Sequence, residues 1–400
     1  MPAQKAVLVI NSGSSSIKFA VIDPQSSERP IEGLAQRVGT PEADLTVTTP
    51  DGSTTPTPAG TDHKGVLTTV LDRCRAWTRA HDVEITAVGH RMVHGGAQFT
   101  ESTLSGPAVL EKARDLITLA PLHNPACIAG VEAVTELWPQ LPQVLVFDTA
   151  FHSGMPPVAY RYAVPQHWYT DLKVRRYGFH GTSHRFVSQG AAHLLDVPVD
   201  RLRLVTAHLG NGSSITAVDR GRSVDTSMGL TPLEGLVMGT RSGDLDPGIF
   251  DYLGTRGMSL SEINTQLNKH SGLLGLSGSS NDMRTLRELS AAGDADAALA
   301  IDVFCYRLAK YVAALCVPMN GMDALVFTGG IGENDALTRA QVCERLGFLG
   351  VTLDPQANRA GGSAARNVAA PGSLPVLVVP TDEELVIARE ARRVAQEARS

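Results

Sequence analysis

The sequence has few cysteines, few aromatic residues and no excess of positive charge. Its five cysteines are odd in number and lack a C-x-x-C spacing, so they argue against a disulfide framework or a zinc site and favour buried, reduced thiols. The formal net charge is -6 and no long Lys/Arg run occurs, which excludes nucleic acid and anionic membrane surfaces as expected partners. There is no apolar run of about 18 residues that could span a membrane. The apolar run near the start is too short for a signal peptide, so we expect a cytoplasmic protein.

What is present favours a folded chain of more than one domain. Of the 400 residues, 43% are hydrophobic and 19% are charged, which is enough apolar material for a core. At about 150 residues per domain, the length predicts two or three domains. The 38 glycines exceed the usual share of about 7% without a repeat period, which indicates tight turns and close backbone approaches.

A strand–turn–strand pattern occurs twice, about half a chain apart. In the first copy, apolar strands over 6–10 and 17–22 flank a turn rich in Gly and Ser. In the second copy, the strands cover 203–208 and 213–218, and the residues after the turn repeat the Ser-Ser-Ile of the first copy. This internal similarity predicts a duplication, in which two related domains each open with a hairpin.

The other predicted elements alternate between strands and helices. Strands are expected at 85–88, 142–147, 323–327 and 375–379, and helices at 62–81, 182–195, 246–256, 282–291, 294–317 and 383–398. The region 40–62, rich in Thr, Pro, Gly and Asp, is typical of an exposed loop or an excursion at a sheet edge. The alternation predicts an α/β fold, and the lack of a clear linker favours two domains that share a cleft.

Three Gly-rich turns follow predicted strands, at 11–16, 210–213 and 329–334. Such turns expose backbone N–H groups that can hold phosphate oxygens. None is a Walker A motif or a good dinucleotide fingerprint, and each alone is more often an ordinary turn. Together they predict a nucleotide site. Lys18, just after the first turn, could bind phosphate as a point charge or lie solvated at a strand edge.

Two arginines and an aspartate lie where α/β proteins place functional groups. Arg91 and Arg241 stand in Gly-rich segments, from which a guanidinium can bind a carboxylate or a phosphate through two hydrogen bonds. Either could instead form a surface ion pair. Asp148 follows a predicted strand directly, a position that suits a functional carboxylate, an Asx turn or a helix N-cap.

The segment 177–184 carries two histidines, His180 and His184, four residues apart. The spacing is that of a metalloprotease helix, but Gly181 stands where the general base would be. No G-x-S-x-G motif occurs, which disfavours a serine hydrolase. We therefore expect a strand end with His180 pointing into the cleft, and Thr182 or Ser183 capping the next helix.

Two glutamates, Glu383 and Glu384, open the last predicted helix. Acidic residues are favourable at a helix N-terminus whatever their function, and the segment also resembles a capping box. Alternatively, a carboxylate here could approach Mg²⁺ directly or through water.

The sequence blocks that contain these residues together resemble the acetokinase family over essentially the whole chain. The strongest are VLVINSGSSSIK at 7–18 and YGFHGTSHRF at 177–186. Supporting blocks in family order are HRMVHGG at 90–96, FDTAFH at 147–152, HLGNGSS at 208–214, MGTRSGD at 238–244, FTGGIGEN at 327–334 and PTDEEL at 380–385.

The resemblance implies a fold of two duplicated actin-like, or ribonuclease H-like, α/β domains around a nucleotide cleft. It places residues 1–150, completed by the last helix at 384–400, on the acyl-substrate side, and 151–383 on the nucleotide side. It also implies a homodimer and the reversible reaction of ATP with acetate to ADP and acetyl phosphate, by direct in-line displacement. Mg²⁺ would be the cofactor, with Mn²⁺ as a substitute.

The family's functional positions can be transferred residue by residue. The resemblance implies catalytic roles for Asp148, His180 and Arg241, and Mg²⁺ binding by Asn11 and Glu383. It implies that Arg91 contacts the substrate carboxylate and that Val93, Leu122, Phe179 and Pro232 form a small acyl pocket. Phosphate contacts are implied for Lys18, His208, Leu209, Gly210, Asn211 and Gly212. The adenosine side would include Asp282, Met283, Arg284, Gly330, Ile331, Gly332, Glu333 and Asn334.

The chain departs from the family pattern at two positions: Met92 replaces a β-branched aliphatic residue, and Asp382 replaces an Asn. Which of Asp382, Glu383 and Glu384 lies nearest the metal stays open, as does whether Asp148 transfers a proton or only orients its neighbours. Two other functions also stay open. One is a propionate or butyrate kinase of the same superfamily, and the other is an ATPase whose output is conformational.

Overall fold

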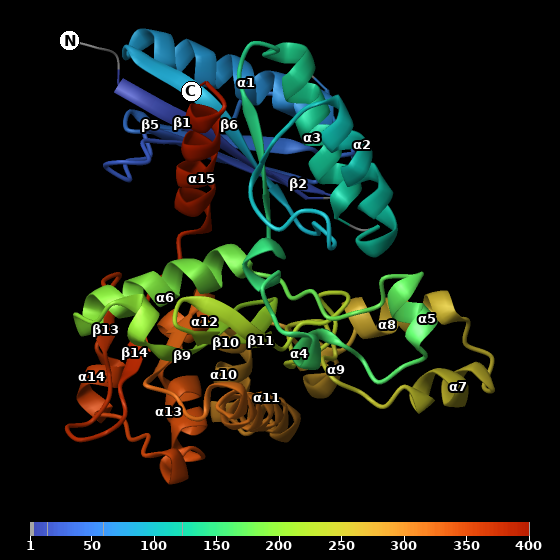
Figure 1. The fold of residues 1–400 in the computed structure, drawn as a ribbon, viewed down its shortest axis with the longest axis vertical. Coiled ribbons are helices and arrows are strands. Elements are labelled where there is room, and N and C mark those ends of the chain that lie inside the picture. The colour runs from blue at the N-terminus through green and yellow to red at the C-terminus, as the bar shows by residue number, and fades with distance from the viewer. Residues whose placement is uncertain (1–3, 14, 59, 122, 400) are drawn as a thin grey trace. The chain divides into compact units, whose positions relative to one another are not determined.

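The computed structural model describes residues 4–13, 15–58, 60–121 and 123–399 (Figure 1). Contacts divide the chain into two units. Unit 1 comprises Met1–Ala150 and Asp382–Ser400, and unit 2 comprises Phe151–Thr381. The two segments of unit 1 therefore lie on either side of unit 2 in the sequence. None of the described helices is long and apolar enough to cross a membrane.

Unit 1 contains a sheet of eight described strands in the order β5-β4-β3-β2-β1-β6-β8-β7. The strands are β1 (Gln4–Ser12), β2 (Ser16–Ile22), β3 (Ile31–Gln36), β4 (Asp44–Thr49), β5 (Gly52–Thr54), β6 (Val83–Met92), β7 (Thr103–Leu104) and β8 (Gln143–Phe147). β1 pairs antiparallel with β2 and parallel with β6, which pairs parallel with β8. The carboxyl ends of β1, β6 and β8 therefore meet at one edge of the sheet.

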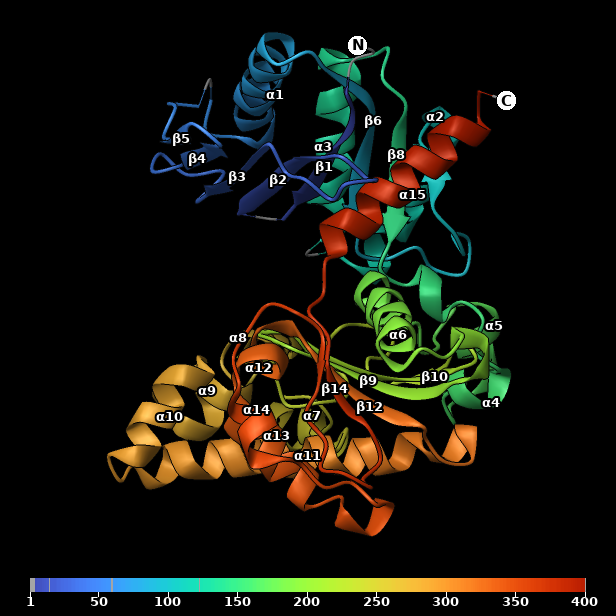
Figure 2. The ribbon, with the colours of Figure 1, turned by 90° about the vertical axis from the view of Figure 1, so that its left-hand side faces the viewer.

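Helices cover both faces of this sheet. They are α1 (His63–Ala80), α2 (Pro107–Asp115), α3 (Asn124–Leu137) and α15 (Glu383–Glu397), with short 3-10 turns at Leu116–Leu119 and Ala150–His152. Alternate residues of β1, such as Leu8 and Ile10, share a buried cluster with residues of α1 and α3. On the other face, Gly89 lies close to Ile387 of α15. In Figure 2, α15 is the red helix in front of β8.

Unit 2 contains a second sheet, whose six described strands have the order β11-β10-β9-β12-β14-β13. They are β9 (Arg203–Leu209), β10 (Ser213–Asp219), β11 (Arg222–Thr226), β12 (Ala324–Thr328), β13 (Arg366–Asn367) and β14 (Val376–Val378). The α-helices are α4 (Pro157–Tyr160), α5 (Gln166–Thr170), α6 (Gly181–Leu195), α7 (Gly248–Gly254), α8 (Leu260–Lys269), α9 (Gly272–Ser277), α10 (Met283–Ala291), α11 (Ala295–Leu315), α12 (Gly329–Asn334), α13 (Ala336–Glu344) and α14 (Pro355–Arg359). Short 3-10 turns lie at Val199–Arg201, Val317–Met319 and Gly347–Leu349.

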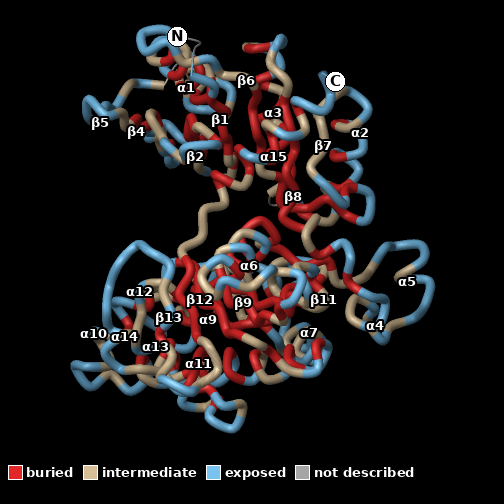
Figure 3. Tube along the Cα trace, turned by 60° about the vertical axis from the view of Figure 1, so that its left-hand side comes forward, coloured by how far each residue is buried: buried red, intermediate tan, exposed pale blue. Residues whose placement is uncertain are grey.

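The second sheet is also buried on both faces. Leu204 of β9 packs in a cluster with Val187 of α6, whereas its neighbour Val205 packs in a cluster with Leu308 of α11. Such strands read as continuous apolar runs because neither side meets water. Figure 3 shows β8, β9 and β12 mostly in the colour of buried residues.

The two sheets share a five-strand core of the same topology, β3-β2-β1-β6-β8 in unit 1 and β11-β10-β9-β12-β14 in unit 2. In each, the first three strands are antiparallel and the last two continue in parallel. The two hairpins predicted from the internal similarity are β1–β2 and β9–β10. The predicted fold class, a duplicated actin-like α/β architecture, is confirmed.

Local predictions need correction at 177–184 and 329–334. His180 does not lie at the end of a described strand, and neither Thr182 nor Ser183 caps α6. His180 itself is the N-cap residue, in the left-handed region at φ 55°. The segment 329–334 is the short helix α12 rather than a turn, and Gly329 enters it at φ +77°. The region 40–62 includes the edge strands β4 and β5, in line with the predicted edge excursion.

Candidate active site

A buried ion pair joins Arg91 and Asp148 at the carboxyl edge of the unit 1 sheet. Arg91 is the penultimate residue of β6, and Asp148 follows β8, its parallel neighbour. Arg91 Nε donates to Asp148 Oδ1 at 3.0 Å, and Nη2 donates to Oδ2 at 2.6 Å. This two-bond geometry fixes the plane of the guanidinium.

Burial and neighbouring charges act on both members of this pair. Burial alone would lower the pKa of Arg91, but the charge and hydrogen bonds of Asp148, with a contribution from Glu383, raise it. Burial raises the pKa of Asp148; Arg91 opposes that rise, and the charge of Glu383 adds to it. Three charged groups, Arg91, Asp148 and Glu383, therefore interact electrostatically within unit 1.

The hairpin β1–β2 brings two other predicted site residues to the same edge. Asn11 and Lys18 lie directly opposite each other in the antiparallel register. Arg91 Nη1 donates a long hydrogen bond, 3.5 Å, to Asn11 Oδ1. Lys18 Nζ instead lies 2.9 Å from Glu384 Oε1, and its side chain is 55% exposed. Asn11 thus joins the Arg91–Asp148 pair, whereas Lys18 is held by an ion pair of its own.

The three acidic residues at the start of α15 have different surroundings. Asp382 caps the helix by accepting from the Leu385 backbone N–H, and it also pairs with Arg29. Glu384 pairs with Arg29 Nη1 at 2.8 Å and with Lys18. Glu383 is the acid whose charge acts on Arg91 and Asp148. Of the three, it is therefore the residue that joins the Arg91–Asp148 cluster.

The oxygen atoms of this cluster are of the chemical kind that binds a magnesium ion. Asn11 contributes an amide oxygen, and Asp148 and Glu383 contribute carboxylates that repel one another. Mg²⁺ prefers such oxygen ligands, and in phosphoryl-transfer sites it uses one or two carboxylates together with substrate phosphates. The described residues contain no group of three or more His, Cys, Asp or Glu side chains placed to hold a metal. A site of this kind requires only two carboxylates.

The predicted acyl-pocket residues divide between the units. Val93 is buried just beyond β6 in unit 1, while Phe179 and Pro232 lie in unit 2. His152 Nε2 lies 2.9 Å from the carbonyl oxygen of Phe179, to which it donates. Leu122 lies outside the described residues. The composition of this pocket therefore remains a prediction.

In unit 2, two predicted histidines lie side by side. The rings of His180 and His208 have centroids 4.3 Å apart, at 31° to each other. Nδ1 of His180 lies 2.9 Å from Ser214 Oγ, and Nδ1 of His208 lies 2.8 Å from Ser183 Oγ. His180 holds a left-handed backbone conformation, which is costly for a residue other than glycine.

The Gly210–Gly212 turn lies against His180 and Arg241. A Cβ placed on Gly212 would be 3.4 Å from Arg241 Nη2 and 3.6 Å from His180 Nε2. Arg241 Nη1 donates to the carbonyl oxygen of Pro232 at 2.8 Å. A Cβ on Gly239 would lie 1.9 Å from Asn211 Oδ1, so a larger residue there would displace the Asn211 side chain. Two positively charged or protonatable side chains and a Gly-rich turn thus meet in unit 2.

A cavity of about 760 Å³ lies beside this turn. Eight of its lining residues were predicted for nucleotide binding: Gly210, Asn211, Asp282, Met283, Arg284, Gly330, Ile331 and Asn334. The sequence analysis missed five others: Asn281, Arg287, Glu288, Asp335 and Leu337. Asp282 caps α10, and its side-chain hydrogen bond from Arg284 is the main cause that lowers its pKa to about 2. The cavity therefore has an acidic residue at its wall that is ionised at neutral pH.

Six other predicted nucleotide residues do not line this cavity: Lys18, His208, Leu209, Gly212, Gly332 and Glu333. Some of them serve the local structure. Glu333 Oε1 accepts from the backbone N–H of Gly329 at 2.8 Å and of Thr381 at 3.2 Å. The carbonyl oxygen of Gly332 accepts from Arg339 Nη1 at 2.8 Å.

Arg339 of α13 was not predicted, although it is among the largest fully buried side chains. Its guanidinium donates to the carbonyl oxygens of Gly332 and Glu333 and to the side-chain and backbone oxygens of Asn358. Desolvation lowers its pKa to about 10. Arg339 therefore ties α12, at the nucleotide-side cavity, to α14.

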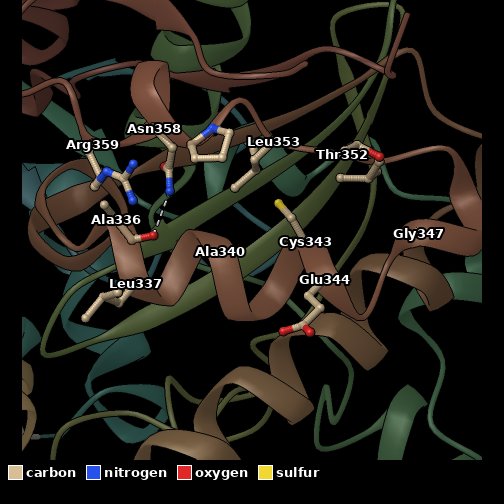
Figure 4. A pocket seen from close by; sticks show the side chains of 12 residues that line it. Ala336, Leu337, Ala340, Cys343, Glu344, Gly347, Thr352, Leu353, Asn358 and Arg359 are labelled. Atoms are coloured by element: carbon tan, nitrogen blue, oxygen red, sulfur yellow. Dashed lines mark hydrogen bonds between the residues drawn. The ribbon is translucent and has the colours of Figure 1, made fainter. Parts of the chain in front are cut away.

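A second cavity, of about 430 Å³, lies between α13 and α14 (Figure 4). Figure 4 shows Ala340, Cys343 and Glu344 along α13 and the hydrogen bond from Asn358 to the carbonyl oxygen of Ala336, which measures 2.8 Å. Leu337 lines both cavities, so α13 forms part of the wall of each.

Comparison with known proteins identifies the family. A profile of the Acetokinase family matches residues 6–389. The chain belongs to the acetokinase family.

Individual members of the acetokinase family are similar to the chain over nearly their whole length. An acetate kinase of Deinococcus radiodurans is 53% identical over 385 residues, covering 96% of each chain. The crystal structure of an acetate kinase from Porphyromonas gingivalis superposes with a TM-score of 0.92 at 42% identity, covering 98% of this chain and 99% of that one. A propionate kinase from Francisella tularensis gives the same TM-score at 44% identity, with 98% and 100% covered.

Proposed function

We propose that this acetokinase-family chain is an acetate kinase, which transfers the γ-phosphoryl group of ATP to acetate and forms acetyl phosphate and ADP. The observation that carries the proposal is the cluster of His180 and Arg241 at the Gly210–Gly212 turn, beside a cavity large enough for a nucleotide. The extensive similarity to acetate kinases supports the same reaction.

The chemistry of the acceptor sets what the protein must supply. The carboxyl group of acetate has a pKa near 4, so it is ionised at neutral pH and needs no general base. Its difficulty is the approach of one anion to another. Two unit charges 4 Å apart repel by about 4 kcal/mol at an effective dielectric constant of 20. Charge neutralisation and positioning are therefore the main catalytic demands.

Arg91 meets the first demand in this proposal by binding the acetate carboxylate. Asp148 holds the guanidinium through Nε and Nη2, so its plane is fixed before the substrate arrives. Val93, Leu122, Phe179 and Pro232 would line the small pocket for the acetate methyl group. Because acetate needs no base, we assign Asp148 the orientation of Arg91 rather than a proton transfer.

Arg241 and His180 meet the second demand. Negative charge on the equatorial oxygens of the phosphoryl group calls for donors fixed in advance. Arg241 is held by the Pro232 carbonyl and His180 by Ser214, and both lie against Gly212. The proposed in-line displacement requires Arg91 of unit 1 and Arg241 of unit 2 to act on the same reaction.

Magnesium and the nucleotide complete the proposal. Asn11 and Glu383, with Asp148 beside them, would hold Mg²⁺, which supplies positive charge to the phosphate oxygens when bound. The cavity lined by Asp282, Met283 and Ile331 would take the adenosine part of ATP or ADP. Lys18 and the Gly210–Gly212 turn would contact the phosphates, for which Lys18 would leave Glu384.

A homodimer and a cytoplasmic location belong to the same proposal. Their support is the family resemblance. Light scattering on the purified protein tests the dimer through its mass, and cell fractionation tests the location.

The experiment that tests the function is a hydroxamate assay for acyl phosphate with acetate, propionate and butyrate, with and without Mg²⁺. We expect Mg²⁺-dependent product and the highest kcat/KM with acetate. One methylene changes binding by only about 1–3 kcal/mol, so some activity with propionate is expected. A preference for propionate would make the chain a propionate kinase. ADP formation that is independent of any carboxylate would indicate a conformational ATPase.

Variants of Arg241 sharpen the assay. Arg241→Ala should lower kcat by about 10²–10³-fold, and Arg241→Lys should not restore it because a point charge lacks the planar fork. Arg256, which stacks on Tyr252 away from this cluster, is a matched control, and Arg256→Ala should keep normal turnover. Equal effects of the two alanine variants would contradict the role of Arg241.

A further inference from the structure

A chain of buried side chains lies behind His180. Its Nδ1 is 2.9 Å from Ser214 Oγ, and the same hydroxyl is 2.8 Å from His184 Nε2. His184 Nδ1 is in turn 2.7 Å from Thr206 Oγ1. Ser214, His184 and Thr206 are fully buried. The family resemblance gave no role to any of these three residues.

The hydrogen-bonding capacity of these groups assigns their protons. Burial, with the nearby His152 and His208, lowers the pKa of His184 well below its ordinary value, so its ring is neutral and carries one N–H. We assign the Thr206 hydroxyl proton to the carbonyl oxygen of Thr216, 3.5 Å away, so that the Thr206 oxygen accepts from Nδ1–H of His184. His184 Nε2 then has a lone pair.

The assignment continues to His180. The lone pair of His184 Nε2 accepts the Ser214 O–H, so the Ser214 oxygen accepts from Nδ1–H of His180. Nδ1 of His180 therefore carries a proton whatever the charge of the ring. A second proton can add only at Nε2, the nitrogen beside Gly212. An N–H donor at Nε2 of His180 is therefore present only when both ring nitrogens are protonated, and the ring is then a positively charged imidazolium.

The backbone makes this side-chain support important. His180 is the N-cap of α6 in the left-handed region, and its side chain makes no capping hydrogen bond to that helix. The ring is thus held through Nδ1 and by the neighbouring His208 ring, 4.3 Å away. For a neutral imidazole, the partner of one nitrogen decides which nitrogen carries the proton.

We propose that Ser214 is a positioning residue that, with His184 and Thr206 behind it, fixes the orientation and the tautomer of His180 so that His180 acts on the phosphoryl group as a cation. Only the catalytic part of this inference rests on the proposed acetate kinase function; the tautomer is a property of the protein by itself. In the catalytic cycle no proton needs to move along this series of hydrogen bonds.

The first test is ¹⁵N NMR of the full-length protein labelled at histidine. The His180 resonances are assigned by their loss in His180→Gln. We expect the neutral ring of His180 in the wild-type protein to carry its proton on Nδ1. In Ser214→Ala this preference should disappear. A proton on Nε2 in the neutral wild-type ring would overturn the proposal.

The second test compares turnover in three variants. Ser214→Ala should lower kcat by about 10–10²-fold, because a misplaced catalytic group is costly, with KM for ATP and acetate within about twofold. Ser214→Cys, which keeps a weak donor and acceptor of similar size, should retain intermediate turnover. Thr216→Val is the matched control, because Thr216 is a buried hydroxyl two residues along the same strand and its Oγ1 partner is Thr226.

The outcomes separate the inference from the function. Unchanged kcat in Ser214→Ala, or an equal loss in Thr216→Val, would overturn the positioning role while the acetate kinase activity stood. A wild-type protein that formed no acyl phosphate but showed the Nδ1 proton and its loss in Ser214→Ala would refute the function and support the hydrogen-bond chain. If Ser214→Ala failed to fold, the tautomer of the wild-type ring and the Ser214→Cys variant would decide.

Discussion

Single residues in this protein hold charge where water has little access. Asp148 is 1% exposed and Arg91 is 23% exposed, so their attraction is weakly screened. Breaking such a pair by removing one partner is expensive because the other charge remains buried. Function and stability therefore meet at the same side chains, and the two can be measured together.

Asp148→Asn tests the orienting role of Asp148. The amide cannot balance the charge of Arg91, so we expect the unfolding free energy to fall by about 3 kcal/mol and kcat by about 10²-fold. If Asp148 orients Arg91, KM for acetate should rise as well. Steady-state kinetics and urea unfolding measure both effects. Near-normal turnover and acetate KM would contradict this role, and a loss confined to kcat would favour proton transfer.

His90 makes stability depend on pH. Burial lowers its pKa from 6.5 to about 4. Between these two values the unfolded chain binds more protons than the folded chain. The unfolding free energy should therefore decrease as pH falls from 6.5 to 4, by up to about 1.4 kcal/mol per pH unit for this residue.

Urea unfolding at pH 7, 6 and 5 checks this pH dependence. His90→Asn, which cannot take up a proton in this range, should show a shallower loss of stability than the wild type. His270→Asn alters an exposed histidine and is the matched control. Parallel curves for the wild type and His90→Asn would show that His90 does not contribute.

At the level of elements, the central strands of both sheets and their first hairpins could be predicted, because apolar, β-branched runs that are buried on both faces are easy to recognise in a sequence. The strands β1 and β9, which open the two hairpins, are such runs, and so is β8, whose end predicts the position of Asp148. The sequence analysis missed several elements, among them the helices α2, α3, α8 and α13 and the strands β3 and β11. The periodicity of α3 is obscured because it is apolar on more than one side.

The supports of the site could not be predicted, because they depend on partners far apart in sequence. Thr381 and Ser183 join through hydroxyls 2.8 Å apart although 198 residues separate them. The left-handed conformation of His180 is likewise set by tertiary contacts rather than by local preference. A buried serine has no distinctive sequence context, so Ser214 gave no signal beyond its place in a family block.

Arg339→Met tests the link between α12, α13 and α14. The substitution removes the Arg339 donor from the carbonyl oxygens of Gly332 and Asn358, and each unsatisfied buried group costs about 1–3 kcal/mol. We expect the unfolding free energy to fall by about 3 kcal/mol. Because α12 carries Gly330 and Ile331 at the nucleotide-side cavity, KM for ATP should rise about tenfold, with KM for acetate nearly constant.

Arg345→Met provides the comparison for Arg339. Arg345 ends the same helix, but its side chain is 33% exposed. It should lose less than about 1 kcal/mol of stability, since surface ion pairs contribute little. Urea unfolding measures the stability of both variants, and ATP saturation curves measure their KM for ATP. An equal rise of KM for ATP and KM for acetate in Arg339→Met would argue against a local effect on α12.

At the scale of the whole molecule, duplication explains why two sheets share one topology, yet the chain order is not a simple repeat. The last helix of unit 1, α15, comes from the end of the chain, after all of unit 2. The internal similarity of the two hairpins indicated the duplication. The role of the last helix followed from the family resemblance, because the sequence of an amphipathic helix does not state which sheet it covers.

Chain truncation tests this arrangement. A chain ending at Thr381 lacks α15, whose buried residues include Leu385, Ile387, Ala388 and Ala391. Each large apolar side chain contributes about 1.5–3 kcal/mol, and a whole domain has only about 5–15 kcal/mol to lose. Limited proteolysis should therefore cleave unit 1 rapidly while fragments of 151–381 persist, and no acyl phosphate should form. A chain ending at Glu397 should remain intact and active, because α15 ends there. One cooperative melting transition and full turnover in the chain ending at Thr381 would show that unit 1 folds without α15.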